Sequence, residues 1–167
     1  MKKLSLIPDL MLDNIYEITP EFLKEKRIRG IVFDIDNTLV PYGIAQPDDV
    51  LTKFLKKISD SVSAVGFVSN NNEERVKLFN NNLGYFASHK ASKPSPKCIN
   101  AFINHFGLKQ EQVLLVGDQL FTDCLAAHLA GIKCIIVKPI EPDTGWFFRF
   151  KRFLEKPFIK VYKNRKN

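Results

Sequence analysis

Short apolar runs alternate with amphipathic segments along the chain. Four apolar runs have the length and composition of buried strands, and they span residues 28–33, 62–68, 113–116 and 134–137. Between these runs, apolar positions at helical spacing predict helices, over residues 48–58, 74–79, 94–106 and 122–130. Strands that alternate with helices over short connections are typical of right-handed βαβ units. The pattern therefore predicts an α/β fold with a mainly parallel sheet.

Two flanking segments differ from this pattern. Residues 1–29 form a mixed lead-in, in which Thr19 followed by Pro20 predicts the start of a short helix. Residues 141–167 form a basic, aromatic tail. We expect the lead-in to pack on a core domain of residues 30–140.

The composition is that of a single globular domain. Of 167 residues, 45% are apolar and 26% are charged, so the chain is long enough to bury a core without disulfides. The three cysteines form no C-x-x-C pair, which argues against a zinc site and a disulfide framework. No apolar run approaches the length of about twenty residues that a membrane span needs. We therefore expect a cytoplasmic protein.

The net charge of +7 is carried entirely by residues 145–167 of the tail. Residues 145–167 contain eight Lys and Arg against Glu155 alone, whereas residues 1–144 are neutral overall. The high isoelectric point therefore describes an attached basic segment and not a basic domain.

An aromatic helical face is predicted at the start of the tail. It consists of Trp146, Phe150, Phe153 and Leu154, and Pro157 is expected to end the helix. Such a face could pack on the sheet, or lie in a membrane interface and attract anionic lipid. It could also stack the bases of a nucleic acid. An anionic membrane and a nucleic acid are both polyanions. The positive charge of the tail therefore fits a peripheral membrane contact and a nucleic acid equally well.

Polar residues follow three of the predicted strands. Asp34 and Asp36 follow the first strand, Ser69 the second and Asp118 the third. Ligands bind at the carboxyl edge of an open α/β sheet, so we expect these side chains to share a site. Taken singly, each has a simpler interpretation: Ser69 is typical of a helix N-cap, and Lys93 of a solvated surface lysine.

The order of these residues resembles the motifs of the haloacid dehalogenase (HAD) superfamily of phosphotransferases. The four motifs are D-x-D-x-T (Asp34 to Thr38), a serine (Ser69), Lys-Pro (Lys93-Pro94) and G-D-x-x-x-x-D (Gly117 to Asp123). The resemblance covers about residues 28–138. It implies a Rossmann-like three-layer sandwich.

The resemblance also implies a catalytic set. Asp34 would be the nucleophile that forms an aspartyl-phosphate, and Asp36 would protonate the leaving alkoxide and later deprotonate water. Ser69 would bind phosphoryl oxygens, and Lys93 would offset the charge of the nucleophile and the phosphate. Asn70 would bind phosphoryl oxygens through its backbone N–H.

The resemblance to the HAD superfamily also implies a bound magnesium ion. The carboxylates of Asp34 and Asp118 and the backbone carbonyl of Asp36 would hold Mg²⁺, which prefers oxygen ligands. Asp123 would support the cluster from behind or orient the lysine. Thr38, the last residue of the first motif, is expected beside the substrate.

Longer stretches narrow the resemblance to the YqeG family of capless phosphatases, in HAD subfamily IIIA. These stretches are residues 15–23, 30–40 and 117–123. Only 31 residues lead from Thr38 to Ser69, and 24 from Ser69 to Lys93. Each interval already contains a predicted helix, which leaves no room for a cap domain.

YqeG proteins are similar to the mitochondrial and plastid phosphatases that convert phosphatidylglycerophosphate to phosphatidylglycerol. The resemblance therefore implies a Mg²⁺-dependent phosphomonoesterase that acts on an anionic phospholipid. Two other functions stay open. One is a phosphatase for nucleic-acid ends, nucleotides or a phosphoprotein, and the other is a binding module without catalysis.

Overall fold

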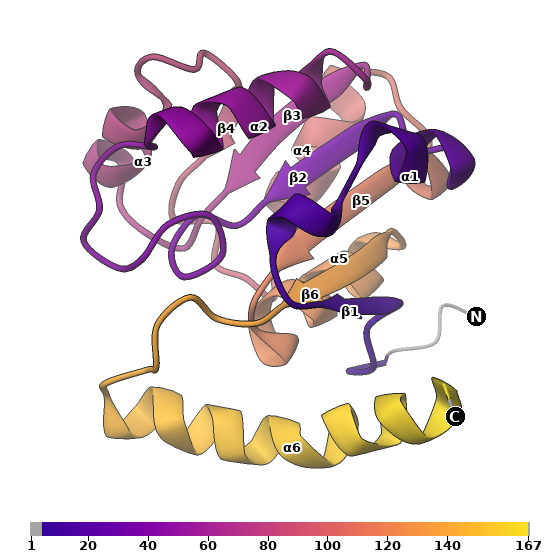
Figure 1. Ribbon diagram of the computed structural model, residues 1–167, viewed down its shortest axis with the longest axis vertical. Coiled ribbons are helices and arrows are strands. Elements are labelled where there is room, and N and C mark those ends of the chain that lie inside the picture. Colours follow the sequence, from indigo (N-terminus) through magenta and orange to yellow (C-terminus); the bar gives the residue numbers. More distant parts are fainter. Residues whose placement is uncertain (1–4, 167) are drawn as a thin grey trace.

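A single parallel sheet forms the centre of the protein. The computed structural model describes residues 5–166, so residues 1–4 of the lead-in lie outside the described chain (Figure 1). The strands are β1 (Leu10–Leu12), β2 (Gly30–Phe33), β3 (Ala64–Val68), β4 (Phe86–Ser88), β5 (Val113–Gly117) and β6 (Lys133–Val137). Their order across the sheet is β1-β6-β5-β2-β3-β4, and every neighbouring pair is parallel.

Helices cover both faces of the sheet and complete three layers. The helices are α1 (Pro20–Glu25), α2 (Asp49–Ser59), α3 (Glu73–Asn80), α4 (Lys97–His105), α5 (Leu125–Ala130) and α6 (Trp146–Lys166). Apolar residues of α1, α2 and α3 share one buried cluster with one face of the sheet. Those of α4 and α5 share a second cluster with the other face. The predicted Rossmann-like α/β sandwich is confirmed, and between β2 and β5 the chain contains no inserted cap domain.

The predicted elements are largely present, with differences at their ends. Thr19 caps α1, because its Oγ1 accepts a hydrogen bond from the backbone N–H of Phe22 at 3.1 Å. The helix predicted over residues 94–106 begins at Lys97 instead of residue 94. A π-helical turn over Leu120–Cys124 precedes α5, where the pattern predicted a regular helix from residue 122.

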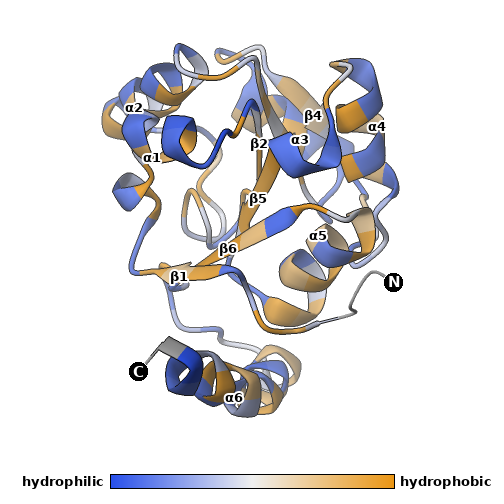
Figure 2. Cartoon of the chain, turned by 90° about the vertical axis from the view of Figure 1, so that its right-hand side faces the viewer, coloured by the Kyte–Doolittle hydropathy of each residue, from blue (hydrophilic) through white to orange (hydrophobic). Residues whose placement is uncertain are grey.

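The tail is a helix whose aromatic face points away from the core. Trp146, Phe150 and Phe153 are 80%, 52% and 62% exposed, so the alternative in which this face packs on the sheet is wrong. The helix instead packs through Glu155 and Tyr162, which are both buried. Figure 2 looks along α6 and shows it beside the β1 edge of the sheet.

The tail helix also runs past its proline. The prediction that Pro157 ends the segment is wrong, because α6 continues to Lys166. Phe158 and Ile159, directly after the proline, pack against the α4–α5 side of the core. This packing holds the second half of the helix in place despite the missing N–H donor. No helix in the described chain is long and apolar enough to cross a membrane.

Candidate active site

Three neighbouring strands deliver the predicted polar residues to one edge. Asp34 follows β2, Ser69 follows β3, and Asp118 follows β5. Because β5, β2 and β3 are adjacent and parallel, their carboxyl ends meet. A pocket of about 400 Å³ opens there, and Asp34, Asp36, Ser69 and Lys93 contribute to its lining.

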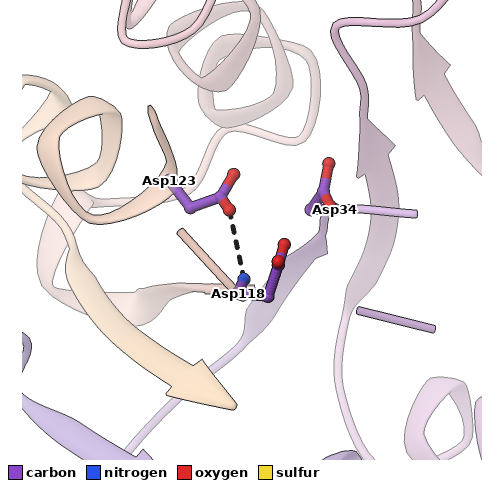
Figure 3. A group of neighbouring side chains, drawn as sticks. All are labelled: Asp34, Asp118 and Asp123. Carbon is purple, nitrogen blue, oxygen red and sulfur yellow. Dashed lines mark hydrogen bonds between the residues drawn. The ribbon is translucent and has the colours of Figure 1, made fainter. Parts of the chain in front are cut away.

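Three buried carboxylates form the floor of this site. Oxygens of Asp34, Asp118 and Asp123 lie within 4.8 Å of one another (Figure 3). Burial, together with the neighbouring carboxylates, raises the pKa of Asp34 to about 6 and that of Asp118 to about 7. The cluster concentrates negative charge in a place where water cannot screen it, so it attracts a cation.

Lys93 supplies part of the opposing charge. Its Nζ lies 2.6 Å from an oxygen of Asp34 and 2.6 Å from an oxygen of Asp123. Burial acts to lower the pKa of Lys93, but the two carboxylates outweigh it and raise that pKa above its ordinary value. The interpretation of Lys93 as a solvated surface lysine is therefore wrong. Asn70 fixes its backbone, since Asn70 Oδ1 accepts from the Lys93 N–H at 2.7 Å.

Asp123 is positioned by the π-helical turn. Its Oδ2 accepts from the backbone N–H groups of Asp118 and Gln119, both at 3.1 Å, while its Oδ1 faces Lys93. A Cβ atom at Gly117 would stand 2.3 Å from the Asp123 side chain. The glycine of the fourth motif is required by this close approach.

Thr38 joins two of the carboxylates. Its Oγ1 lies 3.1 Å from Asp34 Oδ2 and 3.1 Å from Asp118 Oδ1, and the residue is only 2% exposed. A hydroxyl has one proton, so it donates to one carboxylate at a time. The structure thus places Thr38 behind the carboxylates, where it sets their spacing, and not at the pocket surface.

Asp36 stands at the rim of the pocket with a partner that the sequence did not reveal. Arg75 of α3 donates from Nη2 to Asp36 Oδ1 at 2.9 Å. Asn71 Nδ2 donates to Asp36 Oδ2 at 3.1 Å. Arg75 carries no motif, and nothing in its local sequence separates it from the other surface arginines.

Ser69 lines the pocket without capping a helix. The N-cap of α3 is Asn72, whose Oδ1 accepts from the Arg75 N–H, so the N-cap interpretation of Ser69 is wrong. Ser69 Oγ accepts from the backbone N–H of Asn71 at 3.1 Å. Its own proton remains available to an acceptor in the pocket.

A second unexpected cation reaches the cluster from the tail helix. Arg152 forms an ion pair with Asp118 Oδ2 and donates to the Asp118 backbone carbonyl. It also pairs with Asp143 at 2.6 Å and with Glu155 at 3.2 Å. Glu155 in turn accepts from the Leu120 N–H at 2.8 Å. The helix is thus attached to the site by a connected set of polar contacts.

The chemistry of the donors fits a divalent cation. Carboxylate oxygens are hard ligands of the kind that Mg²⁺, Mn²⁺ and Ca²⁺ prefer. Both oxygens of Asp123 are engaged by Lys93 and by backbone N–H groups. Asp34 Oδ2 and Asp118 Oδ1 instead share a single donor, the Thr38 hydroxyl, so these two oxygens are the ones best able to hold a metal.

Comparison with known proteins identifies relatives that are phosphatases. The family described as mitochondrial PGP phosphatase matches residues 1–141. The probable phosphatase YqeG of Bacillus subtilis is 38% identical over 165 residues, which is 99% of this chain and 96% of that protein. The chloroplastic and mitochondrial phosphatidylglycerophosphate phosphatase 1 of Arabidopsis thaliana is 26% identical over 93% of this chain, but only 47% of that protein is covered.

A solved structure shares the fold. The cobalt-bound deoxy-D-mannose-octulosonate 8-phosphate phosphatase of Haemophilus influenzae aligns with a TM-score of 0.55 and 12% identity, over 84% of this chain and 92% of that one. The family match and the relatives, together with the acidic cluster and the buried lysine, define a phosphatase, and its fold is shared with a HAD-superfamily hydrolase of Geobacter sulfurreducens (TM-score 0.50, 16% identity). Within that class, the chain belongs to the PGP phosphatase family and is YqeG-like.

Proposed function

We propose that this phosphatase hydrolyses a phosphate monoester in two steps through Asp34. In the first step a carboxylate oxygen of Asp34 bonds to phosphorus while the bond to the alkoxide breaks, and Asp36 gives its proton to that alkoxide. In the second step water attacks the aspartyl-phosphate, its proton returns to Asp36, and inorganic phosphate leaves. The observation that carries the proposal is the salt bridge of 2.6 Å between Asp34, in the pocket, and Lys93.

The remaining pocket residues suit a phosphoryl group. Ser69 offers a hydroxyl proton, and Asn70 a backbone N–H, to phosphoryl oxygens. Lys93 offsets the charge of the nucleophile and of the phosphate together. Arg75 and Asn71 hold Asp36 at the rim, where a leaving group would depart toward solvent.

Magnesium is the metal that we propose for the site. Asp34, Asp118 and the backbone carbonyl of Asp36 would hold it, with Asp123 behind them. When bound, Mg²⁺ supplies the positive charge that lets an anionic phosphate approach an anionic nucleophile.

We propose further that the substrate is an anionic phospholipid such as phosphatidylglycerophosphate. A family relative is named for that activity. The outer face of α6 supports the same substrate, and we define it as the exposed residues Trp146, Arg149, Phe150, Phe153, Lys156, Lys160 and Val161. Aromatic residues flanked by basic ones are typical of helices that lie in a membrane interface. Each basic residue near an anionic surface contributes about 1 kcal/mol.

The experiment measures vesicle binding and phosphate release together. A double variant Phe150→Ser and Phe153→Ser should lower flotation with anionic vesicles and hydrolysis of phosphatidylglycerophosphate in those vesicles by a similar factor. Leu78→Ser, an exposed apolar residue on α3, is the matched control. Hydrolysis of soluble phosphates without any hydrolysis of the lipid would contradict the lipid substrate. Equal vesicle binding by wild type and double variant would contradict the membrane contact.

A further inference from the structure

The first turns of α6 form one wall of the catalytic pocket. Phe147, Phe148 and Lys151 line the same pocket as Asp34 and Ser69. Phe147 and Phe148 are 56% and 40% exposed, but both lie on the side of the helix that faces the pocket, away from the outer face defined above. The tail helix therefore contributes to the space that a substrate must occupy.

This wall is held firmly against the site. Arg152, the neighbour of Lys151, is paired with Asp118 and Asp143, and Glu155 one turn later binds the Leu120 N–H. These contacts fix the rotation of the helix about its axis. The position of Lys151 relative to the carboxylate cluster is consequently set by the fold.

Within the described part of the chain, Lys151 differs from the other cations around the pocket in having no anionic partner. Lys93 lies between two carboxylates, and Arg75 is paired with Asp36. Lys151 Nζ donates instead to a neutral amide, Gln119 Oε1, at 2.9 Å. Among the described residues, no carboxylate lies within ion-pair distance of it.

Aromatic rings flank the same ammonium group. Lys151 Nζ lies 5.6 Å from the ring centre of Phe147 and 5.4 Å from that of Phe148. Their faces stabilise the cation and shield it from part of the solvent. An anion that enters the pocket would therefore find one uncompensated cation in surroundings less polar than water.

We propose that Lys151 binds a second phosphate group of the substrate, separate from the phosphate monoester that reacts at Asp34. This inference rests on the reaction proposed above. Gln119 holds the ammonium group until the second phosphate replaces the amide as its acceptor. Lys151 is thus a specificity-determining residue, which favours substrates with two phosphate groups over substrates with one. A charge-assisted hydrogen bond of this kind corresponds to roughly a ten- to hundredfold preference.

The test compares two soluble substrates that carry no acyl chains. One is glycerol 3-phosphate, and the other is the same monoester linked through a phosphodiester to a second glycerol. Neither compound binds vesicles, so the outer face of α6 does not affect the result. Wild-type enzyme should show the higher kcat/KM for the phosphodiester compound, mainly through a lower KM. Lys151→Met should reduce this preference at least tenfold, and Lys151→Arg should retain most of it.

Two controls separate the subsite from a structural effect and from the proposed reaction. Lys163→Met removes a charge from the exposed end of the same helix and should keep the wild-type preference. In an Asp34→Asn background, calorimetry measures binding of the two compounds without turnover, so the subsite is tested even if no phosphate is released.

The outcomes are distinct. An equal loss for both compounds in Lys151→Met, or no preference in wild type, overturns the subsite. Absence of phosphate release from both compounds and from p-nitrophenyl phosphate overturns the reaction at Asp34 instead, and calorimetry then decides on the subsite alone.

Discussion

Arg152, in the second turn of the C-terminal helix, forms an ion pair with Asp118, the carboxylate at the end of β5. The basic tail is therefore joined to the acidic cluster and is not an appendage on the surface. A residue that contributes to the tail's positive charge also determines the electrostatics of the candidate metal ligand.

Replacement of Arg152 by Met should change the pH dependence of catalysis and also lower the free energy of unfolding. Arg152 acts to lower the pKa of Asp118, which burial and nearby carboxylates already hold at about 7. Without it, Asp118 should be protonated at neutral pH, so the acidic limb of the pH–rate profile should move to higher pH. Removal of one partner from such a buried pair costs about 3 kcal/mol, which thermal unfolding would detect. Arg165→Met, exposed on the same helix, is the control, and an unchanged pH profile in Arg152→Met would contradict this role.

Replacement of Asp34 by Asn should abolish turnover while the protein stays folded. A carboxamide cannot form the acyl-phosphate, so phosphate release should fall at least a thousandfold. Circular dichroism should remain that of wild type, because the buried position tolerates a neutral side chain of the same shape. Retention of more than a few per cent of the wild-type rate would exclude Asp34 as the nucleophile.

The loss of activity on replacement of Asp36 by Asn should depend on the leaving group of the substrate. An alkoxide needs a proton from Asp36, whereas p-nitrophenolate leaves without one. The loss of kcat should therefore be larger for an alkyl phosphate than for p-nitrophenyl phosphate. Equal losses in a pre-steady-state measurement of the first step would argue against Asp36 as the acid.

The stability of the metal-free protein should fall as the pH rises from about 4 to 7. Asp34 and Asp118 have folded-state pKa values of about 6 and 7, against an ordinary value of 3.8. In this window the folded state binds protons that the unfolded state has already released, so deprotonation favours unfolding. Urea unfolding in the presence of a chelator measures the effect.

The variant Asp118→Asn isolates the contribution of that carboxylate. Its unfolding free energy should decline less steeply than that of wild type over the same pH range. Added Mg²⁺ should stabilise wild type most at the upper end of the range, because ligand carboxylates bind metal when deprotonated. A steeper decline in the variant would contradict the assignment.

The sequence predicts those parts of the fold that have long, regular patterns. The central strands and α2, α3 and α5 follow from apolar runs and from helical spacing. β1 and β4 do not, because three residues are too few to show a period, and tertiary pairing with β6 and β3 defines them. The strand-end residues of the site were predictable because parallel strands bring their carboxyl ends together.

Side-chain partners contributed by distant helices were not predictable. Arg75 and Arg152 are two of many basic residues, and only the packing of α3 and α6 brings them to Asp36 and Asp118. The aromatic face of the tail helix was predicted correctly. The pattern did not decide whether this face packs on the core or points toward solvent. The side that packs on the core carries Glu155, because the Leu120 N–H offers it a buried partner.

The hydrogen bond of 3.0 Å from the Met11 N–H to Tyr162 Oη joins segments 151 residues apart. A ribosome makes all six strands before it makes the helix that carries Tyr162 and Arg152. The arginine partner of the acidic cluster is therefore made after all three of its carboxylates. The active site is consequently complete only in a chain whose C-terminal helix has been made and is docked beside the sheet.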